Sequence, residues 1–268
     1  MNIFEILTQV KDIKKSHYFS FMIPRTLERT KNATFQVLTP HTDPKLKGFP
    51  TPKGTGFFVS DDGYFLTARH VVVNPDGTFV DFKNVRLVKP EYTGVGVIGL
   101  ELVDDYHQFD ICLLKADFNK VKAQDFFKTN KGFAFLQIDY EVPPEGSEVY
   151  SFGYPLPTID VKISEKMMIG FHYYCPRVTS AIISSHYEVI GVVFGQKYPT
   201  CYVIDKALNY GNSGGPIVLQ GNGKVISLCS RFQPVEIPQG NGYVKVPSLY
   251  GVTTSLKNIQ NVLVGYLQ

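Results

Sequence analysis

From about residue 34 the sequence breaks into short apolar or alternating runs that are separated by turn residues. This pattern constrains the fold more than any other feature, because such runs, rich in β-branched and aromatic residues, are typical of strands. Asp61-Asp62-Gly63, between two of these runs, predicts a hairpin turn. The runs of the first half are TFQVLT (34–39), GTGFFVS (54–60), GYFLTARHVVV (63–73), NVRLVK (84–89), GVGVIGLELV (94–103) and FDICLLKA (109–116).

A segment rich in proline, glycine and charged residues, EVPPEGSE (141–148), separates this half from a second half with the same pattern of short strand-like runs. Two sets of this kind predict an all-β fold of two packed, six-stranded antiparallel β-barrels. The runs of the second half are VYSFGYP (149–155), RVTSAIISS (177–185), VIGVVFG (189–195), TCYVID (200–205), GPIVLQ (215–220), KVISLCS (224–230) and SLYGVTT (248–254).

Helices are expected only at the two ends of the chain. Apolar residues recur at helical spacing over residues 3–13, which predicts a short amphipathic helix. Ser255 is suited to cap a C-terminal helix that carries one apolar stripe. We therefore expect an N-terminal helical extension over residues 1–30, a first barrel over 31–140, and a second barrel over 141–268 that ends in the C-terminal helix.

Composition and charge narrow the possible partners. With 268 residues, 44% of them hydrophobic, the chain can bury a sizeable core. Lys+Arg 27 against Asp+Glu 24 leaves a net charge of +3, which argues against nucleic acid or an anionic membrane as a partner. No stretch approaches the ~20 apolar residues that are needed to span a bilayer.

The cysteines and the N-terminus bear on the compartment. Cys112, Cys175, Cys201 and Cys229 lie far apart, a spacing that suits neither a zinc site nor a disulfide framework, although one disulfide stays open. Glu5 stands where a secretion signal would have an unbroken apolar core, and no small-residue cleavage site follows. We therefore expect a cytoplasmic protein that needs no metal ion or other cofactor.

The segment YGNSGGPIV (210–218) sets glycines, Ser213 and Pro216 between two apolar runs. One interpretation is an ordinary tight turn, since glycine tolerates positive φ and proline fixes φ. The other is a backbone that presents the Ser213 hydroxyl with free amides beside it. A nucleophilic serine needs an imidazole to take its proton and a carboxylate to orient that imidazole. The rest of the chain must supply both groups.

His70 is the strongest candidate imidazole, because it closes a predicted strand directly after Thr67-Ala68-Arg69, where a rigid strand end would hold it. Asp110 is the strongest candidate carboxylate. It abuts the apolar run ICLLKA, where burial is costly unless the group is hydrogen-bonded. Asp104 and Asp105 compete with it. The remaining histidines lie in polar or loop-like contexts that favour structural or surface roles: His17, His41, His107, His172 and His186.

The order His70, Asp110, Ser213 matches the chain order of the chymotrypsin arrangement. Three blocks, GTGFFVSDDGYFLTARHVV, FDICLLKA and IDKALNYGNSGGPIV, resemble the signature blocks of the trypsin-like, chymotrypsin-fold serine peptidases. The resemblance runs from about residue 50 to the end and is strongest to the high-temperature-requirement type and other prokaryotic members. It implies the chymotrypsin-like double barrel and a serine endopeptidase that cleaves protein or peptide substrates.

The same resemblance implies roles for single residues. Ser213 would be the nucleophile, His70 the general base and then acid, and Asp110 the orienting carboxylate. The backbone N–H groups of Gly211 and Ser213 would form the oxyanion hole. The specificity pocket would be formed by Ala207 at its floor and by a wall strand, Leu228, Cys229 and Ser230. No acid lies there, so a small or medium apolar P1 residue is expected. Cys229 could be a reactive thiol, but a buried inert cysteine is the favoured interpretation.

Two positions depart from the pattern of the secreted digestive members. Val71 replaces a cysteine that is bridged to a neighbouring strand in those members. Asn212 replaces an aspartate that pairs with a new N-terminus after zymogen cleavage. We therefore expect a protein partner or ligand, rather than trimming, to order the oxyanion hole. High-temperature-requirement members carry a peptide-binding module after the peptidase; with the chain ending at Gln268, we expect none here.

Three functional hypotheses remain open from the sequence. The first is an active serine endopeptidase that forms an acyl-enzyme on Ser213. The second is a catalytically silent peptide-binding or regulatory module on the same fold, and the third is an esterase that uses the same serine. Metal-dependent hydrolysis is not expected, because the sequence holds no HExxH motif.

Overall fold

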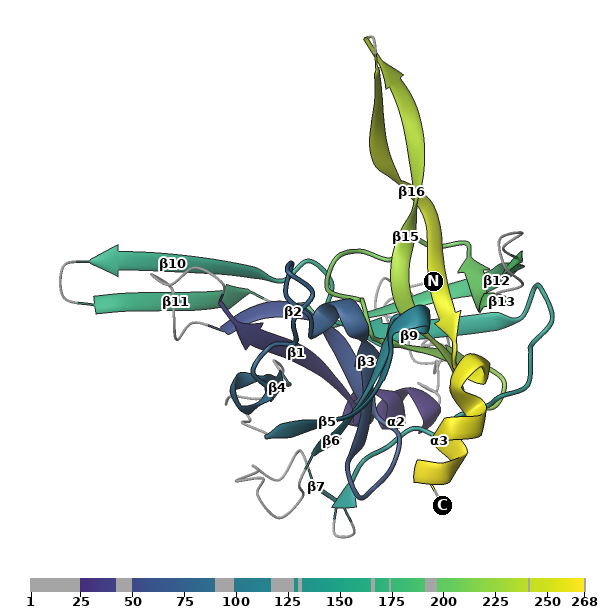
Figure 1. Cartoon of the computed structure of the whole chain (residues 1–268), viewed down its shortest axis with the longest axis horizontal. Coiled ribbons are helices and arrows are strands. Elements are labelled where there is room, and N and C mark those ends of the chain that lie inside the picture. Colours follow the sequence, from purple (N-terminus) through teal and green to yellow (C-terminus); the bar gives the residue numbers. More distant parts are fainter. Residues whose placement is uncertain are drawn as a thin grey trace, which may run out of the picture.

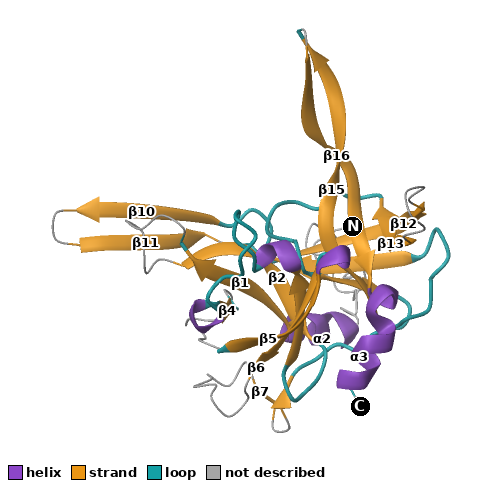
Figure 2. Ribbon diagram, in the orientation of Figure 1, coloured by secondary structure: helices purple, strands orange, loops and turns teal. Residues whose placement is uncertain are grey.

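The computed structural model consists mainly of strands, with a few short helices, as Figure 2 shows. The helices in the described part are α2 (Arg25–Ala33), α3 (Gln260–Tyr266) and short 3₁₀ turns. None of these helices is long and apolar enough to cross a membrane. The structure describes residues 25–41, 50–89, 99–116, 128–129, 132–164, 167–173, 175–190, 197–240 and 242–267.

The first half of the chain forms a six-stranded antiparallel sheet (Figure 1). Its strand order is β4-β1-β2-β3-β6-β5, so β2, β3 and β6 lie near its middle. The turn at Asp61-Asp62-Gly63 joins β2 to β3, as the sequence predicts, and Gly63 has φ 105°. The strands are β1 (Thr34–Pro40), β2 (Pro50–Phe58), β3 (Tyr64–Ala68), β4 (Arg86–Val88), β5 (Leu100–Tyr106) and β6 (Ile111–Ala116).

The second half forms a closed barrel with the strand order β12-β13-β16-β15-β14-β9. Strand β9 closes it by pairing with both β12 and β14. The strands are β9 (Glu148–Gly153), β12 (Arg177–Ile190), β13 (Lys197–Ile204), β14 (Pro216–Leu219), β15 (Val225–Gln239) and β16 (Gly242–Ser255). Two short strands, β7 (Lys128–Thr129) and β8 (Gly132–Phe133), pair with each other in a separate two-stranded sheet.

The prediction of a mainly β fold is confirmed, but the prediction of two closed barrels is not. Within the described residues only the second set of strands closes. In the first sheet the edge strands β4 and β5 do not pair with each other, and residues 90–98, which connect them, lie outside the described part. Closure depends on how two edge strands meet, and the sequence pattern of each strand alone does not fix this.

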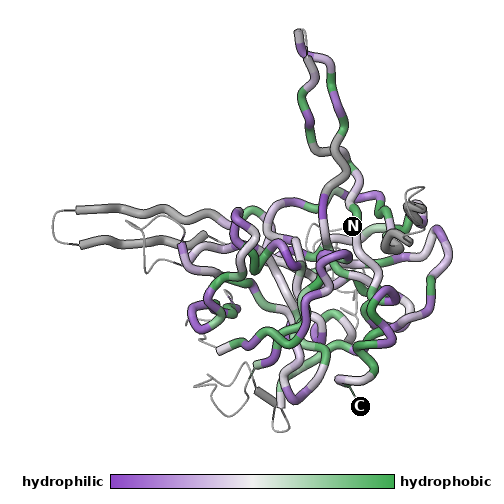
Figure 3. Tube along the Cα trace, in the orientation of Figure 1, coloured by the Kyte–Doolittle hydropathy of each residue, from purple (hydrophilic) through white to green (hydrophobic). Residues whose placement is uncertain are grey.

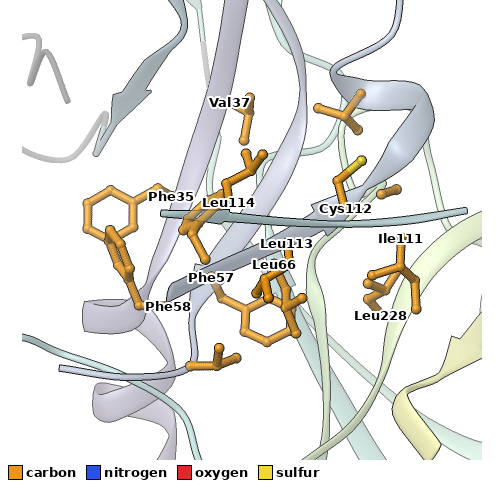
Figure 4. Packing of buried hydrophobic residues seen from close by; sticks show 14 of the residues in the cluster. Phe35, Val37, Phe57, Phe58, Leu66, Ile111, Cys112, Leu113, Leu114 and Leu228 are labelled. Carbon is orange, nitrogen blue, oxygen red and sulfur yellow. The ribbon is translucent and has the colours of Figure 1, made fainter. Parts of the chain in front are cut away.

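One hydrophobic core joins the two halves. Phe58 lies at its centre on β2, stacked on Phe133 with ring centroids 4.3 Å apart and edge-on to Phe35 and Phe65. Leu228 of the barrel belongs to the same cluster and lies beside Ile111 of the first sheet (Figure 4). Buried side chains from both the sheet and the barrel therefore pack together and hold the two halves against each other.

The C-terminal helix packs on this core. The Ser255 side chain accepts a hydrogen bond from Lys257 N and so caps the 3₁₀ turn (Leu256–Ile259) that leads into α3, whereas α3 itself begins after Ile259 without a side-chain cap. Leu263 of α3 is fully buried in the cluster. The helix expected over residues 3–13 lies outside the described residues, and the domain boundaries at 30/31 and 140/141 stay predictions.

Two hairpins project from the body in different directions (Figure 1). One is formed by β10 (Thr158–Ser164) and β11 (Met167–Tyr173), and the other by the outer parts of β15 and β16. The outer β15–β16 ribbon pairs Val235 with Val246 and Ile237 with Val244, while Glu236 and Lys245 form an ion pair at 3.6 Å. Hydropathy alternates along it (Figure 3). The sequence pattern predicted neither projection.

Candidate active site

His70 lies where β3 ends and the chain turns. A 3₁₀ turn, η2 (Arg69–Val71), begins directly after Ala68, and the buried Val71 anchors it in the core. Arg69 N donates to Asp110 O at 2.9 Å, and the Arg69 side chain forms an ion pair with Asp105 at 2.8 Å. These contacts fix the backbone on one side of His70 and leave its ring half-exposed.

Asp110 is the carboxylate that faces His70. Its Oδ2 lies 2.7 Å from His70 Nδ1, and its Oδ1 accepts a hydrogen bond from His70 N at 3.0 Å. The competing Asp105 is instead paired with Arg69, and Asp104 accepts a hydrogen bond from Asp105 N. Asp110 has φ 55° and ψ 40°, a left-handed conformation that is uncommon outside glycine and typical of strained functional positions.

Ser213 lies in the loop between β13 and β14, on the opposite side of the site. Gly211 and Gly214 flank it with φ 97° and 83°, values that glycine reaches without a steric penalty. Ser213 is half-buried and lines the same cavity as His70 and Asp110. In the described part of the chain its hydroxyl forms no hydrogen bond to His70. In structures without substrate, the distance between a catalytic serine and its histidine is often long and shortens only when substrate binds.

The loop around Ser213 leaves two amides free. Gly214 N donates to Cys229 O, and Gly215 N donates to Asn212 O. Among the described residues, neither Gly211 N nor Ser213 N donates a hydrogen bond. Two free amides beside a serine can stabilise an oxyanion.

Thr55 of β2 is a part of the site that the sequence pattern did not reveal. Its N–H donates to Ser213 O at 2.8 Å, and its hydroxyl donates to Gly211 O at 2.6 Å. The side chain is fully buried. The sequence signal for Thr55 is the GTG run before Phe57, and that run by itself predicts only part of a strand.

A cavity of about 540 Å³ opens beside Ser213. The side chain of Leu208 is buried at its wall and packs over Gly251, where a Cβ would come within 2.5 Å of Leu208 Cγ. Leu208 therefore has close neighbours on the side that faces Gly251. The lining residues are His70, Asp110, Leu208, Asn209, Tyr210, Ser213, Cys229, Ser230 and Arg231.

Two of the four predicted pocket residues line this cavity and two do not. Cys229 and Ser230 line it, whereas Ala207 is half-buried outside it and Leu228 lies in the core between sheet and barrel. The side-chain alternation of a strand explains the split, since Leu228 and Ser230 face the first sheet while Cys229 faces the barrel interior. Leu208, Asn209, Tyr210 and Arg231 complete the lining, and the sequence pattern did not single them out.

The cysteines are all free thiols. Cys229 is buried, and its burial raises the pKa of its thiol to about 12. Burial also raises the pKa of the thiols of Cys112 and Cys201, while Cys175 is exposed. The described residues hold no cluster of three or more potential metal ligands.

The chain is similar to known trypsin-like peptidases. A family model described as "Trypsin-like peptidase domain" matches residues 54–228. The probable periplasmic serine endoprotease DegP-like of Hahella chejuensis is 28% identical over 67% of this chain and 29% of its own length. The corresponding protein of Halomonas elongata is 26% identical over 80% of this chain and 37% of its own length. The chain therefore spans about a third of these relatives.

Solved structures show a similar fold at low sequence identity. The HtrA-type protease AlgW with a decapeptide has a TM-score of 0.57 at 18% identity, covering 90% of this chain and 66% of its own. The active form of the Rv3671c protease from M. tuberculosis has a TM-score of 0.58 at 17% identity, covering 92% of this chain and 86% of its own.

The expected cytoplasmic location is contradicted by these relatives, which are named periplasmic endoproteases. The expectation relied on the absence of a disulfide framework and on Glu5, which interrupts the apolar N-terminal segment. The four thiols are indeed free. A chain with a core of this size does not need disulfides to be stable, however, so their absence does not identify a compartment.

Proposed function

This chain belongs to the trypsin-like peptidase family, and from that premise we propose that it is a serine endopeptidase with Ser213, His70 and Asp110 as its catalytic triad. The observation that carries the proposal is the 2.7 Å contact between His70 Nδ1 and Asp110 Oδ2, at a cavity that Ser213 also lines. Asp110 holds the ring so that Nε2 is free to accept a proton.

The proposed reaction has two halves. Ser213 Oγ attacks the scissile carbonyl while His70 Nε2 takes its proton, and the same nitrogen then returns that proton to the leaving amine. The acyl-enzyme is hydrolysed when His70 activates a water molecule in the same manner. Gly211 N–H and Ser213 N–H would bind the oxyanion in both halves, and each such donor is typically worth about 10²–10³ in rate.

The proposed substrate is a protein or peptide chain with a small or medium apolar P1 residue. Two solved structures of similar fold, both of the HtrA-type protease AlgW, contain a decapeptide and a tripeptide, which supports a peptide ligand for this chain. Leu208 and Cys229 give the cavity an apolar lining, which supports an apolar P1 residue. The names of the relatives support a periplasmic location for this chain as well.

Asn212 bears on how activity is switched on. It is buried and uncharged, and its N–H donates to Asn209 O at 3.0 Å within the loop itself. A new N-terminal ammonium would therefore find no carboxylate at this position. We propose that a protein partner or ligand, rather than N-terminal cleavage, raises the activity above its basal level.

The test is labelling with a fluorophosphonate probe, with Ser213→Ala as the matched control. We expect the wild-type protein to be labelled and the variant to remain unlabelled. Proteomic cleavage-site profiling of the same pair then identifies the P1 residue. No labelling under any condition, including with candidate peptides, would favour the second hypothesis, a catalytically silent peptide-binding module. Cleavage of simple esters without cleavage of peptides would favour an esterase.

A further inference from the structure

We propose that Thr55 and Leu156 are positioning residues that set the oxyanion hole. Leu156 binds the carbonyl group of Tyr210, and Thr55 binds the carbonyl group of Gly211, so together they fix the backbone on both sides of the Gly211 nitrogen and Cα. The inference rests on the proposed function, since it assigns Gly211 N–H to the oxyanion. It adds two residues that come from different parts of the fold: Thr55 from β2 of the first sheet, and Leu156 from the loop between β9 and β10.

Leu156 holds the carbonyl before Gly211. Its N–H donates to Tyr210 O at 2.7 Å. The Tyr210–Gly211 peptide is trans, so its carbonyl and its N–H point in opposite directions. Fixing Tyr210 O on Leu156 therefore turns Gly211 N–H away from the 154–157 loop. A rotation of this one peptide would remove the donor from the hole and place a carbonyl oxygen there.

Thr55 holds the carbonyl group of Gly211 itself. Its hydroxyl donates to Gly211 O at 2.6 Å and accepts from Tyr154 N at 3.3 Å. Thr55 is itself fixed, because its N–H donates to Ser213 O and its carbonyl accepts from the Thr67 hydroxyl at 2.8 Å. The one hydroxyl therefore connects the loop of the nucleophile with the loop that contains Leu156.

The conformation of Leu156 shows that its backbone is constrained. Its φ is 51°, one of only two positive φ values among the described non-glycine residues, and the other is Asp110. The side chain is 54% exposed, so packing of leucine does not explain the conformation. Pro155 and Pro157 flank it and restrict the loop. The backbone of Leu156 is strained, its side chain is exposed, and its N–H binds the Tyr210–Gly211 peptide group. This combination is expected of a positioning residue.

The fit of the 154–157 loop against Gly211 is close. A Cβ on Gly211 would lie 2.3 Å from Tyr154 O and 2.8 Å from Pro157 Cδ. The loop therefore contacts the Gly211 backbone directly. The projecting β10–β11 hairpin begins at Thr158, two residues after Leu156.

The first test compares Thr55→Val with Thr55→Ser. Valine has the shape of threonine without the hydroxyl, whereas serine keeps the hydroxyl. We expect Thr55→Val to lower kcat for a peptide substrate about 10- to 100-fold with KM changed less than about threefold, because the weakened donor acts mainly on the transition state. Thr55→Ser should restore kcat to within about threefold of wild type. Rates are normalised to folded protein by thermal unfolding.

The second test compares Leu156→Pro with Leu156→Gly and does not depend on Thr55. Proline removes the N–H and, with φ fixed at about −65°, cannot adopt the φ of 51° found here, so it releases Tyr210 O on both counts, whereas glycine keeps the N–H and adopts positive φ without strain. We expect kcat and the rate of fluorophosphonate labelling to fall at least about tenfold in Leu156→Pro and to recover in Leu156→Gly. The midpoint of the pH–rate profile should stay unchanged, because neither variant touches the His70–Asp110 pair.

The outcomes separate the inference from the proposed function. Full kcat per folded molecule in both Thr55→Val and Leu156→Pro, with an active wild type, overturns the positioning role alone. An equal loss in Thr55→Ser and Leu156→Gly also overturns it, because side-chain packing would then be the cause. A wild-type protein that is neither labelled nor active overturns the proposed function itself, and the inference with it.

Discussion

The Ser230 hydroxyl donates to Asp110 Oδ2 at 3.1 Å, across the junction between the barrel and the first sheet. The same oxygen faces His70 Nδ1, while Oδ1 accepts His70 N–H. Asp110 is therefore surrounded by three donors that come from both halves of the molecule. These contacts hold the carboxylate in one orientation, facing the His70 ring.

Replacing Asp110 with asparagine tests this arrangement. An amide would point a donor at His70 or Ser230, so the ring would turn to the wrong tautomer and Nε2 could no longer accept the Ser213 proton. We expect Asp110→Asn to lower kcat on the order of 10⁴-fold with little loss of stability. Asp104→Asn is the matched control, because Asp104 contacts Asp105 N and not the triad. Equal loss in both variants would contradict the assignment of Asp110.

Replacing Leu208 with alanine tests the pocket. Leu208 lines the cavity, so shortening its side chain enlarges the cavity and should admit a larger P1 side chain. We expect the ratio of kcat/KM for phenylalanine over valine at P1 to rise at least about tenfold in Leu208→Ala. A peptide library profiled with both proteins measures this ratio. Leu102→Ala, at a partly exposed strand position away from the cavity, should leave the ratio as it is.

Thiol reactivity tests the burial of the cysteines. We expect one thiol, Cys175, to react with a disulfide reagent in the native protein near pH 8, and all four to react after denaturation. Burial raises the pKa of Cys229 to about 12, so its thiolate is scarce below that pH even though the residue lines the cavity. Rapid native modification of Cys229, found by peptide mapping, would contradict this prediction.

Replacing Phe58 with alanine tests the shared core. Phe58 is fully buried among Phe35, Phe65 and Phe133. We expect Phe58→Ala to lower the free energy of unfolding by about 3–5 kcal/mol in chemical denaturation. Tyr243→Ala is the surface control, since Tyr243 is 72% exposed on the ribbon and should change stability by less than about 0.5 kcal/mol. A loss below about 1 kcal/mol for Phe58→Ala would contradict the packing.

Local sequence signals predicted the short strands and their turns. The apolar run in FDICLLKA and the Asp61-Asp62-Gly63 turn each act within a few residues, and the structure has β6 and the β2–β3 hairpin there. The cap on Ser255 is equally local. The predicted run over 63–73 continues past His70, whereas β3 ends at Ala68 and His70 lies in the 3₁₀ turn that follows, so the pattern located the strand but not the residue at which it stops.

The remaining features depend on contacts between distant residues. Ser230 and Asp110 are 120 positions apart, and no pattern within either strand indicates that they meet. A leucine at φ 51° gives no sequence signal either, since leucine is not a residue that favours the left-handed region. Prolines at 234, 238 and 247 interrupt the strand pattern of the outer ribbon, which explains why its length was not predicted.

Those three prolines have a further physical effect. A projecting pair of strands offers unsatisfied amides along its edges, and such edges are sites where other polypeptides add and fibrils grow. Proline carries no amide hydrogen, so Pro234, Pro238 and Pro247 each withdraw one donor that an incoming strand would need. The β15–β16 ribbon can thus extend far from the body, with valines and an isoleucine on it, and still resist polymerisation.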